Sequence, residues 1–297
     1  MIVFGKKLTA DDHEPQGAHM SIRRTHIITF ATPNYRQAAD IQAKAVRHFS
    51  QATHMIYGPD HPVVQKLISD HPDHFRHKKG FGYWLWKPYI IRDALSWVPE
   101  GEHVLYLDAG VAPVNEMDEW LAELQKHNIA FVGHDPCVPI TRNTKRDCFI
   151  RLDSDNEETY RAPEVSGGFQ SYRSGPEARA FVEEFMRAMT IPGMNDDSPS
   201  TLGLPELPDF IAHRHDQSVL SIIAHKQGAA LFTEPSQYGR LASHSMRGTP
   251  ESPFLDRDKE HQQIFDVHRL RNRPAYKFYI WRWKRRRALK KLGFKSI

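Results

Sequence analysis

The stretch HVLYLDAGV, residues 103–111, decides which fold the sequence predicts. Four apolar or aromatic residues, Val104 to Leu107, are followed by Asp108, Ala109 and Gly110. This pattern predicts a buried strand that ends in a carboxylate, at the edge where open α/β sheets bind their ligands. A small residue and a glycine after the acid let a ligand approach the backbone closely. A strand-ending Asp that caps a turn is the structural alternative.

Strand-like and helix-like segments alternate on both sides of this stretch. Further strands are predicted at 25–32, 53–58, 129–134 and 229–232, and helices at 35–49, 88–98, 174–189 and 216–228. Ser174 and Glu177 have the spacing of a capping box at the start of the third helix. Strands separated by helices predict an α/β fold with a largely parallel sheet.

Composition limits the class of protein. The chain has 297 residues, 40% of them hydrophobic, which is enough for one large domain with appendages. Its two cysteines form no disulfide framework, so a reducing cytoplasm is the default compartment. The sequence holds no apolar run of about 18 residues, so no spanning helix is predicted.

Charge is divided unevenly along the chain. Residues 268–297 hold twelve Lys or Arg and no Asp or Glu, which leaves 28 minus 36, or −8, for the rest. We expect residues 1–19 to be a tag or leader, because QGAHM (16–20) has the form of a cloning scar. Residues 20–255 are then the globular domain, and residues 256–297 a basic, aromatic-rich helical segment.

A second stretch, GFGYWLWKPYII (80–91), places one cation among aromatic residues. Lys87 comes immediately before Pro88, which suits the first turn of a helix. A cation and a helix N-terminus both favour negative charge, so this position suits an anionic ligand. The alternative is a lysine whose stem lies over an aromatic core cluster.

Four stretches together carry a family resemblance. They are GFGYWLWKPYIIRDAL (80–95), VLYLDAGV (104–111), VSGGFQSY (165–172) and HRHDQSVLSIIAHKQG (213–228). The chain resembles bacterial surface-polysaccharide glycosyltransferases, of O-antigen or capsule type, with a GT-A fold. The resemblance spans roughly residues 25–245. It implies a Rossmann-like domain fused to an acceptor-binding half. It also implies transfer of a sugar, with inversion, from a nucleotide-sugar donor to a glycan or lipid-linked acceptor, as in lipopolysaccharide or capsule synthesis.

In that reading LDAG (107–110) occupies the place of the family's Asp-x-Asp signature, which presents two carboxylates to a divalent cation and the donor diphosphate. Here Gly110 replaces the second acid, which leaves dependence on Mn²⁺ or Mg²⁺ open. Asp108 would contact the metal or the ribose, and His244 would be a late metal ligand. The donor-binding residues implied are Lys87, Asp108, Ala109, Gly110, Tyr83, Trp86, Gly167 and Gly168. Lys87 would hold the diphosphate, the aromatic pair would wall the pocket, and the backbone amides of the glycine pair would face a ligand.

Asp216, in HRHDQ (213–217), is the expected catalytic base, with Glu164 as the alternate. In transfer with inversion a carboxylate takes the proton from the incoming acceptor hydroxyl. A helix N-cap is the structural explanation for Asp216. A metal site that includes His213, His215 and Asp216 is a further alternative.

The basic segment interleaves aromatics with Lys and Arg, as in AYKFYIWRWKRRRALKKLGF (275–294). Trp and Tyr favour lipid headgroups, and basic residues are attracted to anionic lipid. We therefore expect a cytoplasmic protein that is peripheral to the inner face of the bacterial inner membrane. Nucleic-acid binding by this segment competes with that hypothesis, but the acidic body argues against it. A metal-dependent hydrolase that uses Asp108, His213, His215 and Asp216 is the alternative enzyme class.

Overall fold

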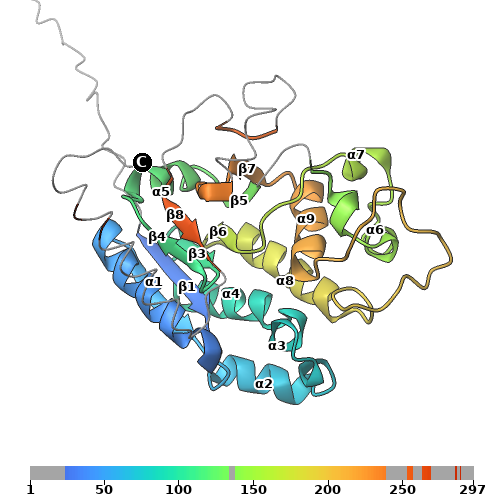
Figure 1. The fold of residues 1–297 in the computed structure, drawn as a ribbon, viewed down its shortest axis with the longest axis horizontal. Helices are drawn as coiled ribbons and strands as arrows, with labels where there is room; N and C mark the ends of the chain where they lie inside the picture. Colours follow the sequence, from blue (N-terminus) through green and yellow to red (C-terminus); the bar gives the residue numbers. More distant parts are fainter. Residues whose placement is uncertain are drawn as a thin grey trace, which may run out of the picture.

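A computed structural model describes residues 24–133, 138–238, 253–256, 263–268, 285 and 288. It shows a six-stranded sheet with helices on both faces, so the predicted α/β class with a mostly parallel sheet is confirmed (Figure 1). The strands are β1 (Thr25–Phe30), β2 (Thr53–Tyr57), β3 (His103–Leu107), β4 (Val111–Pro113), β5 (Ile129–Gly133), β6 (Phe169–Arg173), β7 (Ala230–Thr233) and β8 (Phe265–Val267). The α-helices are α1 (Arg36–Phe49), α2 (Pro62–Asp70), α3 (Gly80–Tyr83), α4 (Trp86–Trp97), α5 (Asp118–Leu124), α6 (Arg146–Arg151), α7 (Glu157–Tyr160), α8 (Pro176–Thr190) and α9 (Asp216–Lys226).

The order of strands in the large sheet is β2-β1-β3-β6-β5-β7. β1 is parallel to β2 and β3, and β5 is parallel to β7. β6 runs antiparallel to both of its neighbours, β3 and β5. Because β6 is reversed, its amino end lies at the edge of the sheet where β3 ends. This places the glycine pair that precedes β6 beside Asp108.

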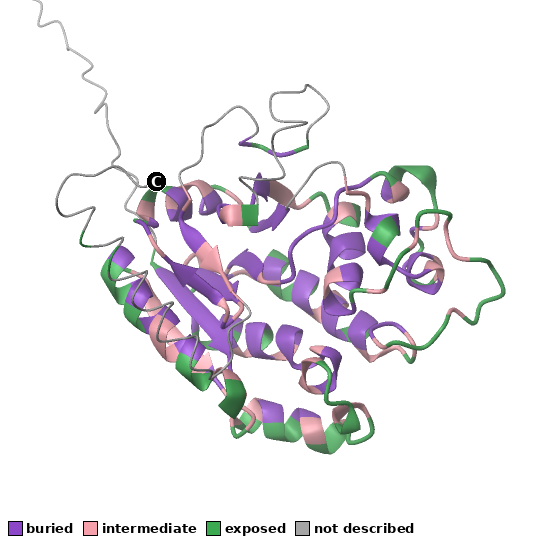
Figure 2. Ribbon diagram, in the orientation of Figure 1, coloured by how far each residue is buried: buried purple, intermediate pink, exposed green. Residues whose placement is uncertain are grey.

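Side chains alternate between two cores along the strands, as a period of two requires. On one face Ile28, Tyr106 and Phe131 pack with residues of α4, α8 and α9. On the other face Ile27 and Leu105 pack with residues of α1 and α5. All of these strand residues are buried (Figure 2). The sheet is therefore covered on both sides, which explains why its strands read as nearly continuous apolar runs.

The predicted strands correspond to β1, β2, β3, β5 and β7, with ends that differ by one or two residues. The predicted helices correspond to α1, α4, α8 and α9. The capping box at Ser174 is wrong: Gly175 is the N-cap of α8 and makes no side-chain cap bond. The Ser174 hydroxyl instead donates to the carbonyl of Val98 at 3.0 Å, which fastens the start of α8 to the end of α4.

The C-terminal part of the chain contributes a strand to the body. β8 pairs antiparallel with β4, and Val111 lies opposite Val267 in this small second sheet. Residues 1–19, and most of 256–297 including the predicted basic helix, lie outside the described residues, so the division into three parts stays a prediction. In the described ranges no helix is both long enough and apolar enough to cross a membrane.

Candidate active site

Asp108 lies where the sequence places it, directly after β3. Its backbone N–H donates to the carbonyl of Gly168 at 3.0 Å, which continues the β3–β6 ladder by one residue. Its side chain is 44% exposed, whereas every residue of β3 is buried. Tyr106, two residues earlier on the same side of the strand, donates its hydroxyl to Asp108 Oδ1. Asp108 is thus a fixed carboxylate that solvent and ligands can reach.

Lys87 joins two carboxylates that are far apart in the sequence. Its ammonium forms an ion pair with Asp216 Oδ2, donates to the carbonyl of Gly167 at 3.0 Å, and lies 3.7 Å from Asp108 Oδ1. The side chain is only 2% exposed and lies over the ring of Tyr106, 5.1 Å from its centroid. Three protein oxygens thus surround an ammonium that has three N–H groups. In this arrangement Lys87 serves the protein's own carboxylates, and it lies inside the first turn of α4 rather than before the helix.

Asp216 is the buried partner of this pair. It is the first residue of α9, whose N-cap is His215, so the N-cap explanation for Asp216 is wrong. Burial raises the pKa of Asp216, attraction to Lys87 lowers it, and the result is about 6. Burial lowers the pKa of the Lys87 ammonium, but the nearby carboxylates of Asp108 and Asp216 outweigh this and raise it. Both groups are therefore charged at neutral pH, and protonation of Asp216 begins just below it.

Gly167 and Gly168 let the two carboxylates approach the backbone. A Cβ at Gly167 would lie 3.1 Å from Asp216 Oδ2, and a Cβ at Gly168 would lie 3.1 Å from Asp108 Oδ2. The two amides are already used: Gly167 N donates to Gln217 Oε1 at 3.1 Å, and Gly168 N donates to Ser166 Oγ at 3.4 Å. The pair thus accommodates the acids, and its amides bond to Gln217 and Ser166 instead of facing a ligand as predicted.

Gly110 is enclosed by backbone, and Ala109 before it is buried. A Cβ at Gly110 would lie 2.3 Å from the carbonyl oxygen of His268, the residue after β8. A second acid at this position therefore has no room. In the described part of the chain no three His, Cys, Asp or Glu side chains are grouped as a metal site requires. Gly110 thus cannot supply the second carboxylate of an Asp-x-Asp metal centre, and dependence on Mn²⁺ or Mg²⁺ stays a prediction.

The side chain of Gln42, in α1, anchors the LDAG turn by hydrogen bonds to its backbone. Gln42 Nε2 donates to the carbonyls of Asp108 and Val111 at 2.8 and 2.6 Å, and Gln42 Oε1 accepts from His54 Nε2 at 2.9 Å. Burial, with a smaller effect of Arg47, lowers the pKa of His54 to about 4, so this histidine is neutral.

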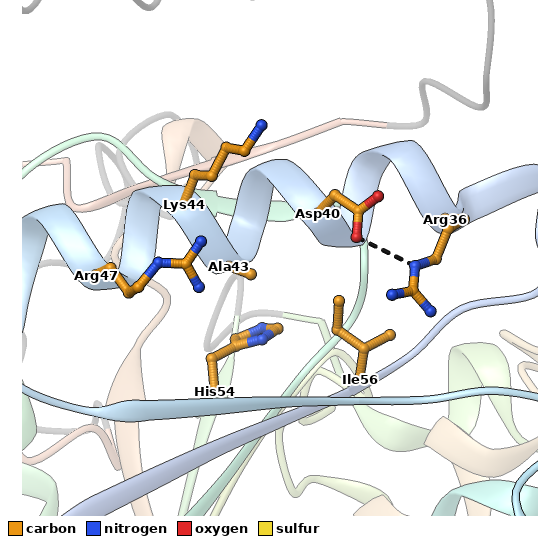
Figure 3. Close-up of a pocket in the computed structure, with 7 residues that line it drawn as sticks. All are labelled: Arg36, Asp40, Ala43, Lys44, Arg47, His54 and Ile56. Carbon is orange, nitrogen blue, oxygen red and sulfur yellow. Dashed lines mark hydrogen bonds and ion pairs between the residues drawn. The ribbon is translucent and has the colours of Figure 1, made fainter.

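His54 also lines a surface hollow of about 390 Å³ between α1 and β2 (Figure 3). The residues lining the hollow are Arg36, Asp40, Ala43, Lys44, Arg47, His54 and Ile56, none of which belongs to the Asp108 cluster.

Glu164 lies on the same connection as the glycine pair. Its Oε2 accepts from Asn143 Nδ2 at 2.9 Å and from Arg214 at 2.8 Å. Its Oε1 is buried and has no hydrogen-bond partner among the described residues. The Glu164 side chain is 4% exposed and that of Asp216 is 7% exposed, so both candidate bases are buried in this structure.

The two aromatics expected to wall a donor pocket have other surroundings. Trp86 is buried, stacks on Phe30 at 3.9 Å and donates its indole N–H to the carbonyl of Gly80 at 3.0 Å. Tyr83 is also buried and stacks on the ring of His215 at 5.1 Å. Trp86 is thus part of the core, while Tyr83 links the segment before α4 to the residue before Asp216.

The histidines of the alternative metal site are used elsewhere. His213 Nε2 donates to the carbonyl of Met194 at 2.8 Å, and His215 Nε2 donates to Asp197 Oδ1 at 2.9 Å. They do not converge on Asp108 and Asp216 as a hydrolase centre would need. His244 lies outside the described residues, so its role as a metal ligand stays a prediction.

Sequence reasoning missed two residues of this cluster. Tyr106 lies in the predicted buried strand, and a period of two places its side chain on the same side as Asp108. Gln217 follows Asp216 in the HRHDQ motif. Its Oε1 is bound to Gly167, and its Nε2 is shielded from solvent with no acceptor among the described residues.

The comparisons with known proteins bear on the fold. No protein-family model and no curated protein sequence matches this chain. Among solved structures, the galactosyltransferase LgtC, in complex with donor and acceptor sugar analogues, is similar with a TM-score of 0.50 and 12% identity. That match covers 92% of this chain and 97% of LgtC. The bifunctional glycosyltransferase WbbM has a TM-score of 0.47 and 12% identity, over 89% of this chain and 50% of WbbM. Mouse xyloside xylosyltransferase 1 has a TM-score of 0.45 and 10% identity, over 83% and 98%. The LgtC match shows that this chain has the fold of a GT-A glycosyltransferase.

Proposed function

We propose that this protein is a glycosyltransferase that moves a sugar from a nucleotide-sugar donor to a glycan or lipid-linked glycan acceptor. One observation carries the proposal: Lys87 bridges an exposed carboxylate, Asp108, and a buried one, Asp216, at the carboxyl edge of a sheet with this fold. Ligands of open α/β sheets bind at that edge. The fold shared with a galactosyltransferase supports the reaction class.

Asp108 is the group that contacts the donor, because it is the exposed member of the cluster. Ala109 and Gly110 shape the turn that presents it, and Gln42 holds that turn. Lys87 keeps both carboxylates in place and offsets one of their two negative charges. Asp108 would then contact the ribose of the donor, and Lys87, 3.7 Å from Asp108 Oδ1, is the cation toward which the diphosphate would lie.

Asp216 is the proposed base for the acceptor hydroxyl, and Glu164 the alternate. A pKa of about 6 leaves Asp216 ionised at neutral pH, yet basic enough to take a proton. As Asp216 takes the proton, the acceptor oxygen attacks the anomeric carbon of the donor sugar from the face opposite the phosphate. The new C–O bond forms while the bond to the donor phosphate breaks, and the nucleoside diphosphate leaves, so the configuration at that carbon inverts. The proton then resides on Asp216, next to Lys87.

We also propose that the protein acts at the inner face of a bacterial membrane, in the synthesis of a surface polysaccharide. The support is the charge of the sequence: residues 268–297 carry twelve Lys or Arg and no acid. Such a segment is attracted to anionic lipid by about 1 kcal/mol for each basic residue near the surface.

A thermal-shift screen with a panel of nucleotide sugars tests the proposed function. A donor that binds the native state raises the midpoint of unfolding by mass action. We expect one donor class to stabilise the wild-type protein and to have a much smaller effect on Asp108→Asn. A panel in which no nucleotide sugar or free nucleotide shifts the midpoint contradicts the proposal.

A further inference from the structure

We propose that Asp197, in the long connection between α8 and α9, is a positioning residue for the Lys87–Asp216 pair. The inference rests on the proposed function, in which that pair supports sugar transfer. The hydrogen-bond and ion-pair partners of Asp197 are Lys79, Tyr83 and His215, not Lys87 or Asp216. It instead binds the two short segments that immediately precede them.

The carboxylate of Asp197 accepts hydrogen bonds from three side chains. Lys79 Nζ lies 2.8 and 3.0 Å from its two oxygens, Tyr83 donates its hydroxyl at 3.1 Å, and His215 Nε2 donates at 2.9 Å. Burial acts to raise the pKa of Asp197, but the hydrogen bonds from Lys79 and His215 outweigh it and lower the pKa to about 2. Asp197 is therefore an anion at every physiological pH, and its three partners are all donors.

The first segment that it holds consists of α3 and Trp84, and its backbone is left-handed rather than that of a regular α-helix. Five consecutive residues, Gly80 to Trp84, have positive φ angles of 58°, 52°, 79°, 48° and 59°. Phe81, Tyr83 and Trp84 carry a Cβ, and each non-glycine residue in this conformation costs roughly 1–2 kcal/mol. Lys79 precedes this left-handed turn and Tyr83 lies near its end, so the Asp197 carboxylate binds a side chain at each end of the turn.

The second segment is a single residue. His215 has φ 55° and ψ −118°, a combination that costs a residue with a Cβ about 1–3 kcal/mol. Its ring is buried against Tyr83 and Trp84, at centroid distances of 5.1 and 5.4 Å. A strained backbone persists only where its surroundings determine it, and Asp197 is the charged group that binds the His215 ring.

Each segment lies shortly before one member of the Lys87–Asp216 pair in the chain. The left-handed turn leads into α4, where Lys87 N donates to the carbonyl of Trp84 at 3.0 Å. His215 is covalently bonded to Asp216. A shift in either segment therefore changes the distance between Lys87 and Asp216, and a misplacement near 1 Å costs about 100-fold in rate.

The connection that carries Asp197 is itself anchored. The buried Lys145 ammonium donates to the carbonyls of Asp196 and Ser198 at 3.1 and 2.9 Å, and to Asp196 Oδ1 at 3.4 Å. Because Asp196 pairs with Lys145 rather than with the strained segments, Asp196→Asn is a matched control. It removes a neighbouring charge from the same connection and leaves Lys145 with its two carbonyl acceptors.

The test compares steady-state kinetics of the full chain with a nucleotide-sugar donor that the wild-type protein uses. We expect Asp197→Asn to lower kcat about 10- to 100-fold with donor KM within about twofold, since the donor contacts Asp108. Asp197→Glu, which keeps the charge, should recover part of kcat, and Asp196→Asn should stay near the wild-type value. Wild-type kcat in Asp197→Asn, or an equal loss in Asp196→Asn, overturns the inference.

A second readout does not depend on activity, so the inference and the proposed function fail separately. The His215 ring N–H that donates to Asp197 should give a slowly exchanging proton NMR signal, assigned by its loss in His215→Gln. We expect this signal to disappear in Asp197→Asn and to persist in Asp196→Asn; its persistence in Asp197→Asn overturns the inference. If Asp197→Asn does not fold, Lys79→Gln and Tyr83→Phe, which each remove one donor, take its place in both measurements.

Discussion

The Lys87 ammonium and the Asp216 carboxylate form a buried ion pair across 129 residues of sequence, with side chains that are 2% and 7% exposed. The hydrogen bond from Lys87 to the Gly167 carbonyl and the nearby Asp108 oxygen complete the surroundings of the ammonium. A buried pair of this kind contributes little when it is replaced as a whole, but loss of one partner leaves an uncompensated charge. The pair therefore links the folding of the chain to the geometry of its candidate active site.

Removal of the cation should destabilise the protein. In Lys87→Met, Asp216 remains buried without its partner, so we expect the free energy of unfolding to fall by about 3–5 kcal/mol. Urea denaturation at pH 8, where Asp216 is ionised, measures this. Lys66→Met is the matched control, because the Lys66–Asp70 pair is exposed and such helical pairs are worth about 0.3–0.5 kcal/mol. Equal losses in the two variants would mean that the buried pair has no special role.

The rate of transfer should fall on the acid side of about pH 6. Asp216 must be ionised to accept a proton, and its pKa in the folded protein is about 6, against 3.8 for a free Asp. Because the folded-state pKa is the higher one, Asp216 contributes less to the free energy of unfolding as pH rises from about 4 to about 6. The rate should therefore increase over this interval although the contribution of Asp216 to stability decreases.

Asp216→Asn provides the control for that profile. We expect this variant to bind the donor nearly as wild type, to lose about 10²- to 10⁴-fold in kcat, and to lose the acid limb near pH 6. A profile of kcat against pH, with donor affinity measured in parallel, distinguishes a base from a residue that orients the donor. An unchanged acid limb in Asp216→Asn would assign the ionisation to another group.

Gly168→Ala should impair donor binding while the protein stays folded. The added methyl group would lie 3.1 Å from Asp108 Oδ2, so the exposed carboxylate must move by a few tenths of an ångström. Gly175→Ala is the control, since its φ of 172° is extended and a Cβ there would lie 3.9 Å from the nearest atom. We expect a raised donor KM in Gly168→Ala only. Identical KM values in the two variants would argue that Asp108 does not contact the donor.

Much of this architecture was predictable from sequence, because apolar runs and helical spacing mark β1, β3, α1 and α9 directly. The sequence did not reveal β6, because FQSYR after a glycine pair reads as a turn with polar residues. Its pairing with both β3 and β5 is a long-range property. Asp108 was identified because a carboxylate after a buried strand is a local signal. The bridging role of Lys87 was not, because its partner Asp216 is distant in sequence.

The glycine pair and Gly110 show the same limit of sequence reasoning. A glycine signals that space is restricted, but not which atoms restrict it. At Gly167 and Gly168 those atoms are the two carboxylates, and at Gly110 they belong to the backbone of His268. The left-handed turn from Gly80 to Trp84 was likewise hidden, because three of its five residues are ones that rarely adopt positive φ.

Deletion of residues 275–297 should release the protein from anionic vesicles and spare catalysis on a soluble acceptor analogue. The deleted part supplies positive charge and aromatics, while the body sums to −8 without residues 268–297. Binding of the full chain should weaken with added salt, because exposed charges are screened over about 8 Å at physiological ionic strength. Vesicle flotation with and without anionic lipid measures this. Equal flotation of both forms, or a preference of the full chain for RNA or DNA, would contradict a membrane role.

Acceptor-dependent release of nucleotide from a nucleotide sugar, measured for wild type and Asp108→Asn side by side, tests whether this protein is a transferase that uses Asp108. The substitution removes the charge of the exposed carboxylate and hardly changes its shape. We expect release by wild type that requires both donor and acceptor, and loss of that release in Asp108→Asn at unchanged thermal stability. Near-wild-type release by Asp108→Asn would contradict the assignment of Asp108, and no release by wild type with any donor and acceptor tested would contradict the proposed transferase.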